Sequence, residues 1–225
     1  MVWHDLEEPT IDEVKDLMQK YDIDPLLAEE LLTETVKPKV DLIGSHIHLV
    51  LHFPFFRKSQ GKVDTIKVRD LQSQNQAQKE HRPARHTLHH EIDFIIGKKF
   101  LITARYGSIE PLERFSKLVE SGGYLEKRNI GEHAGFIFYY LLRDLYRDMV
   151  HEIDSMRDSL HHIENQIFHG NEKNMVYAIS RINRDILTFK ESTNLHKSVL
   201  ESLQNASTKL LGSDFNDHIE LILNK

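Results

Sequence analysis

A run of evenly spaced apolar residues in the second half of the chain most constrains its fold. The residues recur every three or four positions: Tyr146, Met149, Ile153, Met156, Leu160, Ile163 and Ile167. This heptad spacing predicts a long helix whose apolar seam packs on another helix. His169-Gly170-Asn171 predicts a tight break, and a second apolar series predicts a return helix: Val176, Ile179, Ile182, Ile186, Phe189, Leu195 and Leu203. We therefore expect a long antiparallel helical hairpin, with a third helix starting near Ser213 and running to Lys225.

The first 130 residues mix helix and strand signals. Thr10 and Glu13 form a capping-box pattern, and Asp24-Pro25 predicts a second helix start. Alternating apolar residues predict an extended segment over 40–53, and residues 91–105 predict a β-hairpin that turns at Gly97. A helix is expected over 108–119, a short strand over 63–68, and a mobile loop or charged helical excursion over 72–90.

Together these elements predict an α+β fold with α/β/α layers. A mixed β-sheet flanked by helices would be followed by the long antiparallel hairpin. We expect an α/β unit over residues 1–130, the hairpin packed on it over 131–206, and the start of a further helix over 207–225.

Composition excludes several function classes. The chain has 225 residues, no Cys and a formal net charge of -6. Without Cys there are no disulfides, thiolate zinc sites, iron–sulfur clusters or Cys nucleophiles. An acidic chain is a poor candidate for non-specific nucleic-acid binding. The sequence shows no signal peptide, membrane span, phosphate-binding Gly loop or nucleophile elbow, so we expect a soluble protein that is not an enzyme and has no catalytic residues.

Six short motifs occur in an order that is typical of one family. They are Trp3-His4-Asp5-Leu6, the stretch 22–32, Lys37-Pro38-Lys39-Val40, the hairpin 94–103, the stretch 136–148 and Phe215-Asn216-Asp217-His218. In this order they resemble the cytoplasmic part of the CorA family of divalent-cation channels, which includes the related ZntB zinc transporters. Asp24 stands where that family usually has His, and Glu30 stands where it usually has Asp.

The resemblance implies a Mg²⁺ channel, with Co²⁺ or Ni²⁺ as further ions, built as a homopentamer. The third helix would be the start of a stalk directed to the membrane. The family's Gly-Met-Asn loop and two membrane helices are absent, so we expect them beyond Lys225 and expect this chain to be a truncated piece at the cytoplasmic face of the plasma (inner) membrane. No nucleic-acid partner is implied.

The resemblance also implies a regulatory metal site between subunits, where bound Mg²⁺ favours the closed channel. The metal ligands it suggests are Glu29 and Glu30 on one subunit and Asp214 on its neighbour, with Asp217 and Asp144 as further candidates. Mg²⁺ prefers oxygen ligands and keeps several waters, so one or two carboxylates from each side suffice. By spacing alone, these acids are better explained as ordinary solvated helix faces and partners of helix dipoles, and it is the resemblance that suggests a metal site.

Two alternatives stay open. His46, His48 and His52 share one face of the extended segment, and His86, His89 and His90 have helical chelate spacing, so either set is a candidate Zn²⁺ site in a ZntB-like transporter. The same histidines also fit a polar strand face and a solvated loop. The second alternative is a free-standing helical interaction module with no role in transport.

Overall fold

In this computed structural model, residues 1–55, 90–121 and 133–224 are described. A five-stranded mixed sheet lies at the centre, in the order β1-β5-β4-β3-β2. The strands are β1 (Val2–Glu7), β2 (Lys39–Ile43), β3 (His46–Phe53), β4 (His90–Ile96) and β5 (Phe100–Arg105). β1 pairs with β5 in parallel, and the other neighbours are antiparallel. The expected strand over 63–68 and loop over 72–90 lie outside the described residues, except that His90 begins β4.

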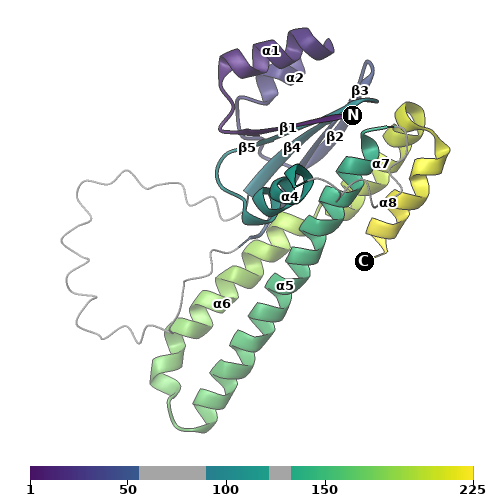
Figure 1. Ribbon diagram of the computed structural model, residues 1–225. Helices are drawn as coiled ribbons and strands as arrows, with labels where there is room; N and C mark the ends of the chain where they lie inside the picture. Colours follow the sequence, from purple (N-terminus) through teal and green to yellow (C-terminus); the bar gives the residue numbers. More distant parts are fainter. Residues whose placement is uncertain (56–89, 122–132, 225) are drawn as a thin grey trace.

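Helices cover both faces of this sheet, which confirms the layered α+β fold (Figure 1). On one side lie α1 (Ile11–Tyr21) and α2 (Pro25–Glu30). On the other side α4 (Glu110–Glu120), α5 (Gly135–Phe168) and α7 (His196–Leu211) approach the sheet. The remaining helices are α6 (Glu172–Thr193), the 3₁₀ turn η1 (Ser213–Phe215) and α8 (Asn216–Leu223), so a helix does begin near Ser213. None of the helices in the described ranges is both long and apolar enough to span a bilayer.

Local signals place most of these elements correctly. The Thr10 hydroxyl accepts the Glu13 N–H, and the Glu13 carboxylate accepts the Thr10 N–H, so the predicted capping box is present. The hairpin at Gly97 is also confirmed. The single extended segment expected over 40–53 is wrong, because β2 and β3 form a hairpin around Gly44 and Ser45. Gly44 has φ +58°, a left-handed conformation that glycine adopts at little cost in a tight turn.

Alternate residues of the central strands enter two different cores. Odd-numbered residues of β3 pack toward α4, α5 and α7: Ile47, Leu49, Leu51 and Phe53. The second face carries Ile95 and Ile102, which pack against Leu27 of α2, against Leu31 directly after it, and against α1. Every residue of β3 is therefore buried, although three of the eight are histidines.

The antiparallel hairpin is formed by α5 and α6, which extend together beyond the sheet (Figure 1). The expected continuous return helix is wrong, because α6 ends at Thr193 and α7 begins at His196. α7 lies against β2 and β3 and buries its own Leu200 and Leu203 there. It thereby covers an apolar face of the sheet that would otherwise be exposed. The seam is also only partly closed, since Ile153 is 39% exposed. The proposed division into 1–130, 131–206 and 207–225 stays a prediction.

His196 joins three elements at the break between α6 and α7. Its Nε2 donates to the carbonyl of His52 in β3 at 2.9 Å. A neutral imidazole then leaves Nδ1 to accept from the Tyr146 hydroxyl of α5, at 2.8 Å. Burial lowers the pKa of His196 to about 4, so the ring stays neutral in the folded protein.

A leucine under the sheet and a leucine in the seam of α5 should differ in how much free energy of unfolding is lost when each is replaced by alanine. Leu203→Ala removes a side chain that is 0% exposed and should lower the free energy of unfolding by about 2–5 kcal/mol. Leu160→Ala, in the seam of α5, removes a side chain that is 45% exposed and should cost less than about 1 kcal/mol. Urea unfolding of both variants measures the difference, and equal costs would contradict a hairpin with a half-open seam.

The buried His196 predicts a loss of stability in acid. The pKa is depressed in the folded state, so the unfolded chain takes up a proton first as the pH falls below 6.5, and stability is lost down to about pH 4. Relative to His196→Gln, the wild type should lose about 2 kcal/mol between about pH 7 and about pH 5. Urea unfolding at about pH 7 and about pH 5 measures it. His151→Gln, which changes an exposed histidine of α5, is the matched control and should keep the wild-type pH dependence.

Candidate functional site

The structure places the suggested metal ligands on two sides of the sheet. Glu29 is exposed and Glu30 half-buried, both at the end of α2. Asp214 and Asp217 are exposed, in η1 and in the first turn of α8. α2 packs into the core that includes Ile95, whereas α8 packs with α5 and α7 on the opposite face. A single chain therefore does not bring the two groups together, and a metal site made of both requires a second copy.

Asp144, a further candidate, lies in a different environment. Its side chain in α5 is buried, and Oδ1 lies 3.3 Å from Arg147 Nη1 and 4.0 Å from Arg143 Nη2. Asp148, one turn later, pairs with Arg114 of α4. A Mg²⁺ ion at Asp144 would have to compete with arginine charge, so this carboxylate is the least suited of the five.

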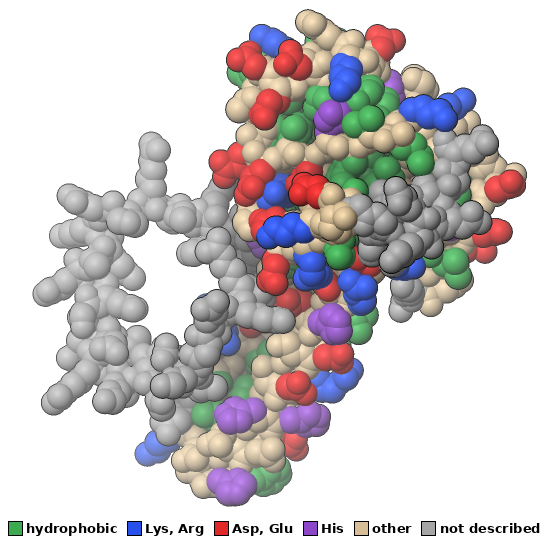
Figure 2. Space-filling view, in the orientation of Figure 1, with side chains coloured by type: hydrophobic (Ala, Val, Ile, Leu, Met, Phe, Trp, Pro, Cys, Tyr) green, Lys and Arg blue, Asp and Glu red, His purple; other side chains and the backbone are tan. Residues whose placement is uncertain are grey.

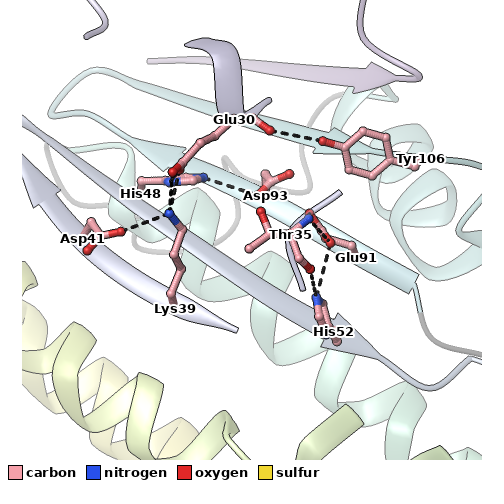
Figure 3. Close-up of polar contacts among 9 residues, drawn as sticks. All are labelled: Glu30, Thr35, Lys39, Asp41, His48, His52, Glu91, Asp93 and Tyr106. Carbon is pink, nitrogen blue, oxygen red and sulfur yellow. Dashed lines mark hydrogen bonds and ion pairs between the residues drawn. The ribbon is translucent and has the colours of Figure 1, made fainter. Parts of the chain in front are cut away.

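A cluster of charged and polar side chains lies on the second sheet face, beneath α2 (Figure 3). We call it the α2-side cluster; its members are Glu30, Thr35, Lys39, Asp41, His48, His52, Glu91, Asp93 and Tyr106. Strand register explains why they meet. Asp41 stands opposite His48 in the β2–β3 pair, and His52 stands opposite Glu91 in the β3–β4 pair. Alternation along each strand then directs these side chains to the same face.

Lys39 links α2 to the sheet. Its Nζ lies 2.8 Å from Oε1 and 2.7 Å from Oε2 of Glu30, and 3.3 Å from Oδ2 of Asp41. Partial burial lowers the pKa of the ammonium. The hydrogen bonds and negative charges of Glu30 and Asp41 outweigh that effect and raise the pKa above its usual value. The Lys39 side chain therefore stays protonated and positively charged between two carboxylates.

His48 continues this contact into the interior. Its Nδ1 lies 3.1 Å from Glu30 Oε2, and its Nε2 lies 3.3 Å from Asp93 Oδ1. The His48 and Asp93 side chains are fully buried, so a row of alternating acid and imidazole runs from α2 to β4. Burial raises the pKa of Asp93 to about 6, although the hydrogen bond from His48 opposes the shift. Above that row, the Tyr106 hydroxyl donates to the Glu30 carbonyl.

A second set of contacts fixes the segment between α2 and β2. The Thr35 N–H donates to both carboxylate oxygens of Glu91, at 2.8 Å each. His52 Nε2 lies 3.0 Å from the Thr35 carbonyl and 3.3 Å from Glu91 Oε2. These bonds satisfy buried polar groups that would otherwise be costly. They hold the backbone at residue 35 independently of Glu30.

The histidines that suggested a zinc site fall into separate environments. His46, His48 and His52 are buried rather than solvated, and each has a polar neighbour in the fold. His90 begins a strand, and 86 and 89 lie outside the described residues. Within the described ranges, no three His, Asp or Glu side chains converge as a possible metal site.

Other histidines gather near the far end of the hairpin (Figure 2). His161, His162 and His169 are all exposed there. That end of the hairpin lies away from the sheet and from α2 (Figure 1), so these residues are separate from the α2-side cluster.

Sequence reasoning missed Glu91 and Asp93 as partners of the histidines, and it missed Lys39 as the partner of Glu30. The alternation of Glu91 and Asp93 with apolar residues in β4 was the available signal, because it places both acids on one face. The sequence motif that contains Lys39 suggested a turn, not an ion pair with Glu30.

The α2-side cluster holds more acidic than basic side chains, and its inner members are buried. Four carboxylates face one lysine and two histidines: Glu30, Asp41, Glu91 and Asp93. Such an acidic excess favours a bound cation. In this chain the Lys39 ammonium supplies that charge at Glu30.

Comparisons with solved structures show the same fold at low sequence identity. The complete structure of the CorA magnesium transporter from Methanocaldococcus jannaschii superposes with a TM-score of 0.72 at 17% identity, covering 99% of this chain and 61% of that chain. The soluble domain of the same CorA gives 0.72 at 16% identity, covering 99% and 77%. The ZntB cytoplasmic domain from Vibrio parahaemolyticus gives 0.63 at 12% identity, covering 99% and 82%. The chain thus spans about three fifths of the complete CorA chain.

Sequence comparison is more specific than fold. No curated protein matches the chain. The model of the family described as CorA-like Mg2+ transporter protein matches residues 1–225, the whole chain. The chain therefore belongs to the CorA-like Mg²⁺ transporter family.

Proposed function

We propose that this chain is the ion-sensing part of a divalent-cation channel of the CorA family, with Mg²⁺ as the regulating and transported ion. The observation that carries the proposal is the family match over all 225 residues. In the intact protein, the part described here would lie at the cytoplasmic face of the membrane in a homopentamer, with α8 continuing toward the membrane.

The placement of the acids supports a sensing site between copies. Glu29 and Glu30 lie at the end of α2, and Asp214 and Asp217 are exposed near the start of α8. The two pairs lie on opposite faces of the sheet, so neighbouring copies in a ring can bring one pair to the other. Mg²⁺ needs few protein oxygens and keeps its remaining waters, which suits a shared site of this kind.

The mechanism follows from charge. Without a cation, facing carboxylates on neighbouring copies repel each other and favour a looser ring. Mg²⁺ bound between them removes the repulsion and holds the copies together, so it stabilises the closed arrangement relative to the open one. The transported ion then limits its own entry.

The zinc alternative has less support. The strand histidines that suggested it are buried, and His48 and His52 already contact Asp93 and the Thr35 carbonyl. The described residues give no observation that favours Zn²⁺ over Mg²⁺. The fold similarity to a ZntB cytoplasmic domain is shared with CorA and does not discriminate between them.

Mg²⁺ should promote self-association of the 225-residue chain, and the predicted ligands should be required. Sedimentation velocity over a Mg²⁺ titration at constant ionic strength measures this response. In the double variant Glu30→Gln, Asp214→Asn, the Mg²⁺ concentration at the midpoint of self-association should rise by roughly tenfold or more. The reason is that losing an interaction with a charged group costs about 1.5–3 kcal/mol.

The control carries the same change in net charge at unrelated positions. Asp12→Asn with Asp158→Asn alters two exposed acids, in α1 and α5, and should respond to Mg²⁺ as the wild type does. Circular dichroism establishes that each variant is folded. A wild-type response that persists unchanged in Glu30→Gln, Asp214→Asn would contradict the proposed site.

A further inference from the structure

The carboxylate of Glu30 is already occupied by a cation of its own chain. Lys39 Nζ lies within 2.8 Å of both Glu30 oxygens, and His48 Nδ1 lies 3.1 Å from Oε2. The ammonium therefore uses the lone pairs that a divalent cation would need. Glu29, the neighbouring residue, is exposed and has no such contact with Lys39 or His48.

We propose that Lys39 is a built-in competitor of the divalent cation at Glu30. Mg²⁺ coordinates Glu30 only after the ammonium has moved away, so the Glu30–Lys39 pair raises the Mg²⁺ concentration at which the site fills. The inference rests on the proposed function, because it assumes that Glu30 is a metal ligand. It adds that the threshold of the sensor is set inside one subunit.

The structure provides a second partner for the displaced ammonium. Asp41 Oδ2 lies 3.3 Å from Lys39 Nζ, and the Asp41 side chain is 46% exposed. Lys39 and Asp41 stand two residues apart in β2, on the same face of the strand. When Mg²⁺ takes Glu30, the ammonium keeps its contact with Asp41 and gains solvent, which lowers the cost of the exchange.

The surrounding fold does not depend on the Glu30–Lys39 pair. The Lys39 backbone stays paired with Val50 in the β2–β3 hairpin. The segment after α2 stays fixed by the Thr35 bonds to Glu91, and α2 keeps its buried Leu27. Movement of the lysine side chain is therefore a local change.

Lys39→Met tests the proposal, because it removes the charge while keeping most of the side-chain length. The Mg²⁺ midpoint of self-association, measured by sedimentation velocity at constant ionic strength, should fall by about threefold to fivefold, as expected for a partly exposed ion pair. Lys37→Met is the matched control: it removes the same charge two residues away, at an exposed position, and should shift the midpoint much less.

Asp41→Asn provides a test of opposite sign. Without its second partner the ammonium should hold Glu30 more tightly, and the midpoint should rise. In the Lys39→Met background the same substitution should have little effect, because the two changes act through one interaction. Adding Glu30→Gln to Lys39→Met should abolish the fall in the Mg²⁺ midpoint.

The outcomes separate this inference from the proposed function. A response that needs Glu30 but is equal in the wild type, Lys39→Met and Lys37→Met overturns the inference alone. No response in the wild type, with a Glu30-dependent response in Lys39→Met, supports the inference and contradicts Mg²⁺ sensing by the wild-type chain. No response in any variant overturns both.

Discussion

The row Glu30–His48–Asp93, whose two inner side chains are fully buried, is the interaction on which the second face of the sheet depends. A strand covered on both sides is usually apolar throughout, yet β3 carries three histidines on one of its buried faces. A buried imidazole needs polar partners. His48 Nε2 is hydrogen-bonded to Asp93 on the neighbouring strand, and Nδ1 lies 3.1 Å from Glu30 of α2 without a hydrogen bond. α2 and the residue that follows it therefore contribute both the apolar cover of Leu27 and Leu31 and the outer carboxylate of the row.

Glu30 consequently has two proposed roles. In the single chain it is the partner of Lys39 and His48, and in the proposed assembly it is a ligand for Mg²⁺ shared with a neighbour. These roles are compatible because the carboxylate lies at the edge of the cluster, half-buried, while the deeper contact between His48 and Asp93 does not involve it. A site at such an edge senses the cation without exposing the core.

Signals confined to a few residues predicted the fold well. The capping box at Thr10, the hairpin at Gly97 and the break at Gly170 all lie where the sequence indicates them. The turn at Gly44 and the separation of α7 from α6 were missed. α7 separates from α6 and packs on β2 and β3. The apolar spacing continues through 195–203 as if one helix ran on, so it gives no sign of this packing against the sheet.

The candidate site was less accessible to sequence reasoning for the same reason. The pairing of Asp93 with His48 and of Glu91 with His52 depends on the register of β3 against β4, strands separated by 36 residues of chain. Short-range spacing does not determine such a register. The acids suggested for the metal site came from the family resemblance, and the contact of Lys39 with Glu30 became visible only in the structure.

The proposed function requires that a divalent cation binds between copies of this chain. The most direct measurement is a crystal structure of the chain grown with Co²⁺, whose anomalous scattering locates the ion independently of the water structure. We expect an anomalous peak between Glu29 or Glu30 of one copy and Asp214 or Asp217 of the next, with the Lys39 ammonium turned toward Asp41. A peak confined to the exposed histidines of the hairpin, with none between copies, would contradict binding between copies. Glu30 still bound to Lys39 beside an occupied site would contradict only the role of Lys39 as a competitor.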